Sequence, residues 1–163
     1  MIKLRKFDEI TMTADVEYEV INPSKYTAHA TVFQAQFEIE GRLTYIVKVM
    51  ESIKYDLVIN EDLYPKMESN ELLFYSNIGG YDIADVGNAF KVFATVLKIF
   101  KEDFLDKERP RYFHFSAEES SRKKLYNHFA NNVEKYLPGY SFMGVPDDRR
   151  STDVDSYYYF ERK

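Results

Sequence analysis

The spacing of apolar residues changes along this chain from a period of two to a period of three and four, and then returns to two. The stretch Thr27 to Ile39, TAHATVFQAQFEI, alternates, with Phe33, Ala35 and Phe37 on one face and Val32 and Gln34 on the other. Period two is that of a β-strand with one buried face. The chain is therefore predicted to begin as a sheet and to add helices later.

Further strands are predicted on both sides of this stretch. The segment Arg42 to Met50 alternates again after the turn residues Glu40-Gly41, which predicts a hairpin. An earlier strand is predicted in Ile10 to Ile21 and a short apolar strand in Glu71 to Asn77.

The period then becomes helical. Apolar residues recur at steps of three and four from the segment that opens at Asn88, namely Phe90, Phe93, Leu97, Phe100 and Phe104. Asp85 or Asn88 is expected to cap this helix by accepting hydrogen bonds from its first backbone N–H groups. Arg109-Pro110 closes the connection, because proline cannot extend a helix.

The C-terminal third repeats the sequence of strand and helix. Arg111 to Ala117 is predicted as a strand, and Ser120 or Ser121 as the cap of a second helix over 122–136. Pro138-Gly139 ends that helix, and the remainder, YSFMGV, a polar loop and YYYFERK, is predicted to form a long hairpin. Strands, helix, strand, helix and hairpin together indicate a mixed α/β sheet in a single domain, residues 1–163.

Composition removes several classes of function. The chain of 163 residues has no cysteine, which excludes disulfides and thiolate metal sites, and no metal site is predicted. No apolar run approaches the roughly 20 residues of a membrane span, and the formal charge of -5 disfavours nucleic acid as a partner. A cytoplasmic location is expected.

The strand FHFSA, the turn and helix EESSRKKLY, Gly139-Tyr140 and the strand SYYYFERK together resemble the C-terminal half of the GNAT N-acetyltransferase fold. SSRKKLY and GNAFKVFATV are also similar to segments of small uncharacterised proteins of tailed phages. The resemblance implies a GNAT-like, mostly antiparallel mixed sheet with two main helices and a C-terminal hairpin. It also implies the host cytoplasm as the location, if the chain is phage-encoded.

An active GNAT enzyme would bind acetyl-CoA here. The resemblance assigns the pyrophosphate cradle to the loop IGGYDIADVGNAF, with Gly79, Gly80, Gly87 and Asn88 as cofactor-binding residues. It assigns Tyr126 as the general acid for the departing thiolate and makes Glu71 the candidate general base.

The same loop argues against that chemistry. It carries Asp82 and Asp85 and contains neither lysine nor arginine, whereas the family usually places a basic residue there. Two carboxylates beside a pyrophosphate repel it. Tyr126 has an alternative interpretation as a packing residue, whose ring would hold the second helix on the sheet.

Two histidines suggest a different enzyme. His29 with Thr31, and His114 with Ser116, share the form histidine, apolar residue, hydroxyl, and both pairs lie on predicted strands. Two-histidine phosphoesterases use such pairs as general base and general acid.

Taken together, the pattern favours a non-catalytic or diverged GNAT-like domain that binds a host or phage protein; the sequence establishes no cofactor, and acetyl-CoA is the candidate. Tyr 14 and Phe 13 supply aromatic side chains for such an interface. An acyl-CoA-dependent N-acetyltransferase and a two-histidine phosphoesterase remain the alternatives.

Overall fold

The computed structural model describes residues 17–21, 31–39, 43–76, 86–117, 120–146 and 156–163. The fold is α/β with a mostly antiparallel mixed sheet, which confirms this part of the predicted fold class; likeness to the GNAT fold stays a prediction. Its described residues group into two compact units, each assembled from two stretches of chain. The first unit contains Met1–Val49 and Phe74–Glu108, and the second contains Met50–Leu73 and Arg109–Lys163.

The first unit contains the N-terminal strands and the long helix. Its strands are β1 (Tyr18–Ile21), β2 (Thr31–Ile39), the first part of β3 (Leu43–Ile59) and the last part of β4 (Asp62–Ser76). β1 pairs antiparallel with β2, Tyr18 opposite Phe37. The expected alternation of β2 is confirmed, because Phe33, Ala35 and Phe37 are buried while Val32 is exposed.

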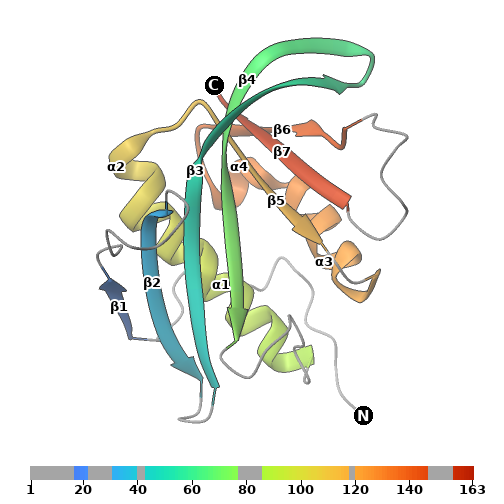
Figure 1. The fold of residues 1–163 in the computed structure, drawn as a ribbon. Helices are drawn as coiled ribbons and strands as arrows, with labels where there is room; N and C mark the ends of the chain where they lie inside the picture. Colours follow the sequence, from blue (N-terminus) through green and yellow to red (C-terminus); the bar gives the residue numbers. More distant parts are fainter. Residues whose placement is uncertain (1–16, 22–30, 40–42, 77–85, 118–119, 147–155) are drawn as a thin grey trace. The chain divides into compact units, whose positions relative to one another are not determined.

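Helix α1 (Val86–Phe100) packs on these strands (Figure 1). Phe93 lies 6.3 Å from Phe74 of β4, between ring centroids. The apolar stripe is buried where its side chains are described, but burial extends around the helix to Val92, Val96 and Ile99. Of the described side chains of α1, only Lys98 is not fully buried, so this part of the helix lies in the interior rather than at the surface.

The helix begins two residues before Asn88, and its helical backbone continues to Glu108, in agreement with the predicted stop at Arg109-Pro110. It begins at Val86, so Asn88 lies inside its first turn rather than at its cap, and Asp85 is outside the described residues. After Phe100 the backbone widens into one π-helical turn, η2 (Lys101–Leu105), before the short α2 (Asp106–Glu108). Phe104 of this turn still packs, 6.2 Å from the ring of Phe33.

The second unit contains the rest of β3 and β4 together with β5 (Tyr112–Ala117), β6 (Tyr140–Gly144) and β7 (Ser156–Arg162). Its strand order is β3-β4-β5-β7-β6. β5 is parallel to β4, whereas β7 is antiparallel to both β5 and β6. The predicted strand at Arg111 to Ala117 and the predicted C-terminal hairpin are thus confirmed.

One face of this sheet is covered by α3 (Ser120–Asn131) and α4 (Val133–Tyr136). Phe115 of β5 stacks on Phe160 and Tyr158 of β7, and its ring also contacts Tyr126 and Phe129 of α3. Helix α4 ends at Tyr136, and the turn that follows contains Gly139, whose φ of 95° suits glycine better than any other residue.

The opposite face is partly covered by the chain's own long hairpin. β3 continues beyond the predicted end at Met50, and β4 begins at Asp62 rather than at Glu71. Asn60 and Glu61, both with positive φ, form the tight turn between them. Ile59 bridges to Pro146 and the Asn60 side chain donates to the Met143 carbonyl at 2.9 Å, so the hairpin end lies beside β6 (Figure 1).

Candidate functional site

A histidine lies between two hydrogen-bonding side chains in the second unit. The parallel register places Glu71 of β4 opposite His114 of β5. The Nε2 atom of His114 is 3.1 Å from Glu71 Oε2, and its Nδ1 atom is 2.7 Å from the hydroxyl of Ser69. Ser69 and Glu71 are two residues apart on one strand, which lets both side chains reach the same ring.

The directions of these hydrogen bonds follow from the donor inventory of the three groups. A carboxylate only accepts hydrogen bonds, so Glu71 receives the proton of Nε2. Nδ1 of a neutral imidazole then accepts, and the Ser69 hydroxyl donates to it. Serine, histidine and carboxylate are therefore linked in series, the order used by hydrolases that activate a serine.

The burial of Ser69 and His114 argues against a role of this network in catalysis. Ser69 is 0% exposed and His114 is 5% exposed. The imidazole also stacks on Tyr159 of β7, with ring centroids 4.7 Å apart and planes 18° from parallel. The Ser69 oxygen is thus closed to a substrate, and of the three side chains Glu71 has the largest exposed fraction, 31%. The geometry is that of a satisfied polar group inside a core.

Tyr126, the predicted general acid, is also in a core. It is 1% exposed, and its ring meets Phe115 edge-on at 5.3 Å and Tyr158 at 6.2 Å. These contacts hold α3 on β5 and β7. A proton donor at this position would have to reach a coenzyme sulfur through that packing.

The other predicted residues are spread over both units. Thr31 opens β2 in the first unit and is half-buried, while Ser116 is half-buried on β5, two residues after His114. Gly87 lies with Asn88 in the first turn of α1. Gly79, Gly80 and His29 lie outside the described residues, as do Asp82 and Asp85. The structure brings together Glu71 and His114, which the sequence assigned to two different enzymes.

A cleft of about 490 Å³ opens in the second unit, between the first half of β4 and the start of β5. Its walls combine aromatic, aliphatic and charged side chains: Leu63, Tyr64, Pro65, Lys66, Met67, Glu68, Asn70, Pro110, Arg111 and Tyr112. The Arg111 guanidinium lies 5.1 Å from the centroid of the Tyr112 ring. Partial burial raises the pKa of Tyr64, and the nearby charges of Asp62 and Glu161 raise it further.

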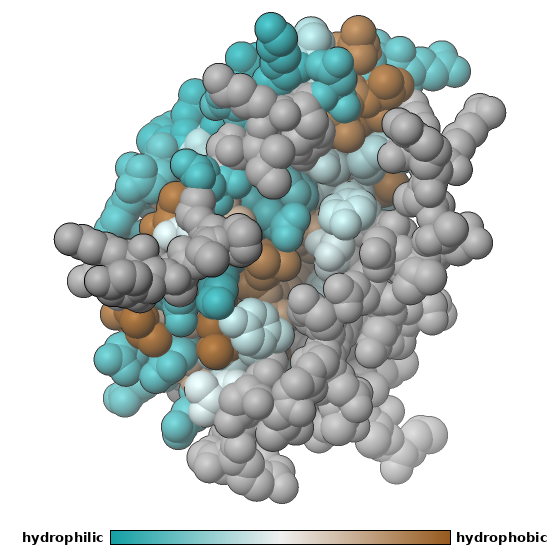
Figure 2. Space-filling model, viewed as in Figure 1, coloured by the Kyte–Doolittle hydropathy of each residue, from teal (hydrophilic) through white to brown (hydrophobic). Residues whose placement is uncertain are grey.

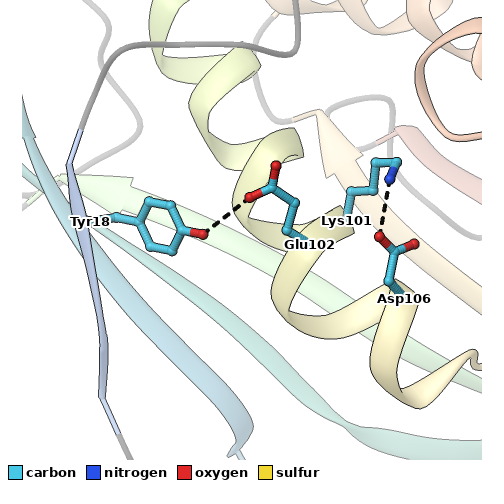
Figure 3. Close-up of polar contacts among 4 residues, drawn as sticks. All are labelled: Tyr18, Lys101, Glu102 and Asp106. Atoms are coloured by element: carbon cyan, nitrogen blue, oxygen red, sulfur yellow. Dashed lines mark hydrogen bonds and ion pairs between the residues drawn. The ribbon is translucent and has the colours of Figure 1, made fainter.

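A separate cluster of polar side chains lies at the π-helical turn of the first unit. Tyr18 of β1 donates to Glu102 at 3.3 Å, and Lys101 binds Asp106 at 3.0 Å across the turn (Figure 3). Burial raises the pKa of Tyr18, and the hydrogen bonds and charges of Asp103 and Glu102 raise it further. The hydroxyl therefore keeps its proton and anchors β1 to the turn. Single π turns are frequent at functional sites, although here the contacts are structural.

Sequence reasoning missed Ser69 and the cleft. Ser69 could have been found from its position two residues before Glu71. If the predicted strand had been extended toward the N-terminus, both side chains would have been placed on the same face. Pro65 and the charged residues around it hid that extension, because proline is rare inside strands.

Comparison of the chain with protein-family models, with curated proteins and with solved structures finds no significant match. Within the described ranges, no group of three or more histidine, aspartate or glutamate side chains is arranged to hold a metal ion. No helix in that same part of the chain has the length and apolar character needed to cross a membrane.

Proposed function

We propose that this chain is a GNAT-like domain that works by binding a protein, a host or phage factor, rather than by catalysis. One observation carries the proposal: of the groups suited to catalysis, Ser69, His114 and Tyr126 are buried, while a cleft in the same unit is open. Ser69, His114 and Tyr126 are all buried among aromatic rings. The cleft presents Tyr64, Tyr112 and Arg111, and tyrosine and arginine are favoured anchors at protein interfaces.

The order of elements supports the scaffold part of the proposal. A helix, α1, connects the parallel strands β4 and β5, a second helix follows β5, and β6 with β7 forms the closing hairpin. These are the features that the resemblance of the sequence to GNAT proteins implies.

An exposed apolar side chain in the cleft lining supports the binding part of the proposal. Leu63 is 63% exposed in β4, directly after the hairpin turn. Val58 and Val145 are exposed in the same unit, and Figure 2 shows hydrophobic residues at the surface near the hairpin end, at the upper right. Exposed apolar residues gathered in this way mark interaction sites.

The test is affinity capture from the cells that naturally express the chain. We expect a stoichiometric protein partner with the wild-type chain and its loss with Leu63→Asp. Val32→Asp is the matched control, because Val32 is also an exposed apolar strand residue but lies on β2, so its capture should be unchanged. Failure to recover a stoichiometric partner, or equal capture by both variants, would contradict the proposal.

An acyl-CoA-dependent N-acetyltransferase is the second candidate, and Glu71 is the observation that favours it. Its carboxylate is partly exposed and bonded to His114, as a general base with an orienting partner would be. Release of coenzyme thiol from acetyl-CoA in the presence of an amine, abolished by Glu71→Gln, would select this candidate over the binding proposal.

A further inference from the structure

Two exposed apolar side chains face each other at the end of the β3–β4 hairpin. The turn residues Asn60 and Glu61 both have positive φ, as a two-residue hairpin turn requires. Such a turn places Val58 of β3 directly opposite Leu63 of β4. Val58 is 41% exposed and Leu63 is 63% exposed. Directly opposite residues point to the same face of a hairpin, so the two side chains form one apolar surface.

The burial of the neighbouring residues agrees with this register. Ile59 belongs to a buried apolar cluster, and Leu57 and Tyr64 pack against that cluster. Period two directs these three side chains to the face opposite that of Val58 and Leu63. The residues that alternate with the exposed pair are therefore used for the interior of the unit, and the pair itself is left at the surface.

Val145 extends the apolar surface on the side of β6. It follows Gly144, the last residue of β6, and it is also exposed. The next residue, Pro146, forms a bridge with Ile59, so Val145 lies beside the hairpin end.

We call Val58, Leu63 and Val145 the apolar tip. In the described part of the chain, the other large hydrophobic side chains of comparable exposure are Val20 and Val32, both in the first unit. The described residues of the second unit thus have their most exposed apolar side chains at one place, which is the pattern of an interaction site.

Negative charge surrounds the apolar tip. Within residues 56–66 the charged side chains are three carboxylates and one cation, all exposed: Asp56, Glu61, Asp62 and Lys66. Asp62 forms no ion pair with another described residue. Burial raises the pKa of the neighbouring Tyr64, and the negative charges of Asp62 and Glu161 raise it further. A positive charge is therefore attracted to this end of the unit.

We infer that the apolar tip binds a segment of the partner protein in which an apolar side chain stands beside lysine or arginine. The inference rests on the proposed binding function and specifies the surface and the chemistry of its partner. The apolar side chain packs on Val58 and Leu63. Lysine and arginine suit this surface, because their apolar stems cover it while their charged heads reach carboxylates such as Asp62.

The first experiment selects peptides displayed on yeast against the folded wild-type chain. Three random libraries have the same apolar content, and their remaining positions are basic, acidic or uncharged. We expect the basic library to be enriched. No enrichment, or enrichment of the acidic or uncharged library, would overturn the inference. Because a chain with a formal charge of -5 attracts cations over its whole surface, the site of the enriched peptide must then be located.

Two charge reversals locate the site with a synthetic peptide of the most enriched sequence. The peptide should bind Asp62→Lys about tenfold or more weakly than the wild type. Glu38→Lys is the matched control, because Glu38 is an exposed strand carboxylate of the first unit and its reversal changes the net charge equally. Equal weakening by the two variants would show attraction to the chain as a whole and would overturn the site.

Leu63→Asp separates apolar contact from attraction between charges. The substitution makes the chain more negative, so a purely electrostatic complex would become tighter. Docking on the apolar tip should instead become about tenfold or more weaker. Val32→Asp adds the same charge at an exposed apolar residue of β2 and should not weaken binding. Unchanged or tighter binding by Leu63→Asp would overturn the inference. Melting curves establish that each variant is folded.

Sedimentation of the wild-type chain alone tests a second copy of this chain as the occupant of the apolar tip. We expect a monomer at the concentrations of the peptide assay. A dimer that is dispersed by Leu63→Asp would overturn the inference.

Failure of the inference can be told apart from failure of the proposed function. If the peptide is indifferent to Asp62→Lys while capture from cells still depends on Leu63, the basic chemistry of the partner is refuted and the proposed function stands. Failure to capture a stoichiometric partner would defeat the proposed function itself, whatever charge the selected peptides carry.

Discussion

Ser69, Glu71 and His114 show how a buried polar group is kept in an otherwise aromatic interior. Each ring nitrogen of His114 has a partner, and Tyr159 covers one face of the ring. A buried polar atom left without its partner costs more than the hydrogen bond contributes when made. The network therefore fixes the register of β4 against β5 more than it offers a reactive group.

Removing the serine hydroxyl tests that role. Ser69→Ala deletes the donor to Nδ1 in a fully buried position, so we expect the free energy of unfolding to fall by about 1–3 kcal/mol. Ser141→Ala is the control, because its bond to the Glu161 carbonyl is long, 3.4 Å, and only partly buried. Its loss should be below about 1 kcal/mol in urea unfolding. Equal losses for the two variants would contradict the structural role of the network.

Tyr18 gives a prediction for alkaline pH. Its pKa is raised in the folded chain by burial and by Asp103 and Glu102, so the folded state keeps a proton that the unfolded state releases near pH of about 10. This group's contribution to stability is then constant below that pH and is lost progressively above it.

The measurement is the free energy of unfolding from neutral pH to alkaline pH. Glu102→Gln should make the alkaline decline shallower, because it removes one of the charges that hold the proton on Tyr18. Glu108→Gln, an exposed carboxylate in α2, should leave the decline as in the wild type. A decline that is unaffected by Glu102→Gln would show that this contact does not act on Tyr18.

At the scale of elements, the sequence predicted the strands and helices in which the apolar spacing is not interrupted. β2, β5, the C-terminal hairpin and the helices were predicted because their apolar spacing is clear. The second half of β3 and the first half of β4 were missed. Charged residues and Pro65 interrupt the alternation there, and the turn at Asn60 and Glu61 lacks the usual glycine.

The π-helical turn was also missed, for another reason. A stripe at steps of three and four continues through Phe104 whether or not one turn is wider. The wider turn is a property of the backbone, from which Phe104 packs against Phe33 and Phe100, and such tertiary contacts are not encoded in the apolar spacing.

The close approach of the hairpin end to β6 can be tested with a matched pair of glycine substitutions. Gly144 has a φ of 131°, and a Cβ there would lie 2.9 Å from Ile59 and 3.0 Å from Asn60. Gly139 also has a positive φ, 95°, but a Cβ there would meet nothing within 4 Å.

Both alanine variants carry backbone strain of about 1 kcal/mol or more, and Gly144→Ala should lose further stability through the clash. The midpoint of urea unfolding measures both, with the wild type as reference. If the urea midpoint of Gly144→Ala is not below that of Gly139→Ala, the packing of the hairpin end against β6 is contradicted.

At the scale of the whole molecule, β3 and β4 are long enough to contribute to both compact units. The sequence predicted a single domain over residues 1–163, and that assignment stays a prediction. The candidate site was predicted only in pieces, because Glu71 and His114 are 43 residues apart and were assigned to separate reactions. Their pairing depends on the parallel register of two strands, which no local pattern in the sequence encodes.

The central claim is that this chain binds a protein and does not use acetyl-CoA. Thermal melting with and without millimolar acetyl-CoA tests it most directly, because a ligand that binds only the folded state raises the midpoint. An equal concentration of ATP controls for unspecific binding of phosphates. We predict the same midpoint with acetyl-CoA as with ATP. A rise specific to acetyl-CoA, accompanied by release of its thiol when an amine is added, would contradict the claim.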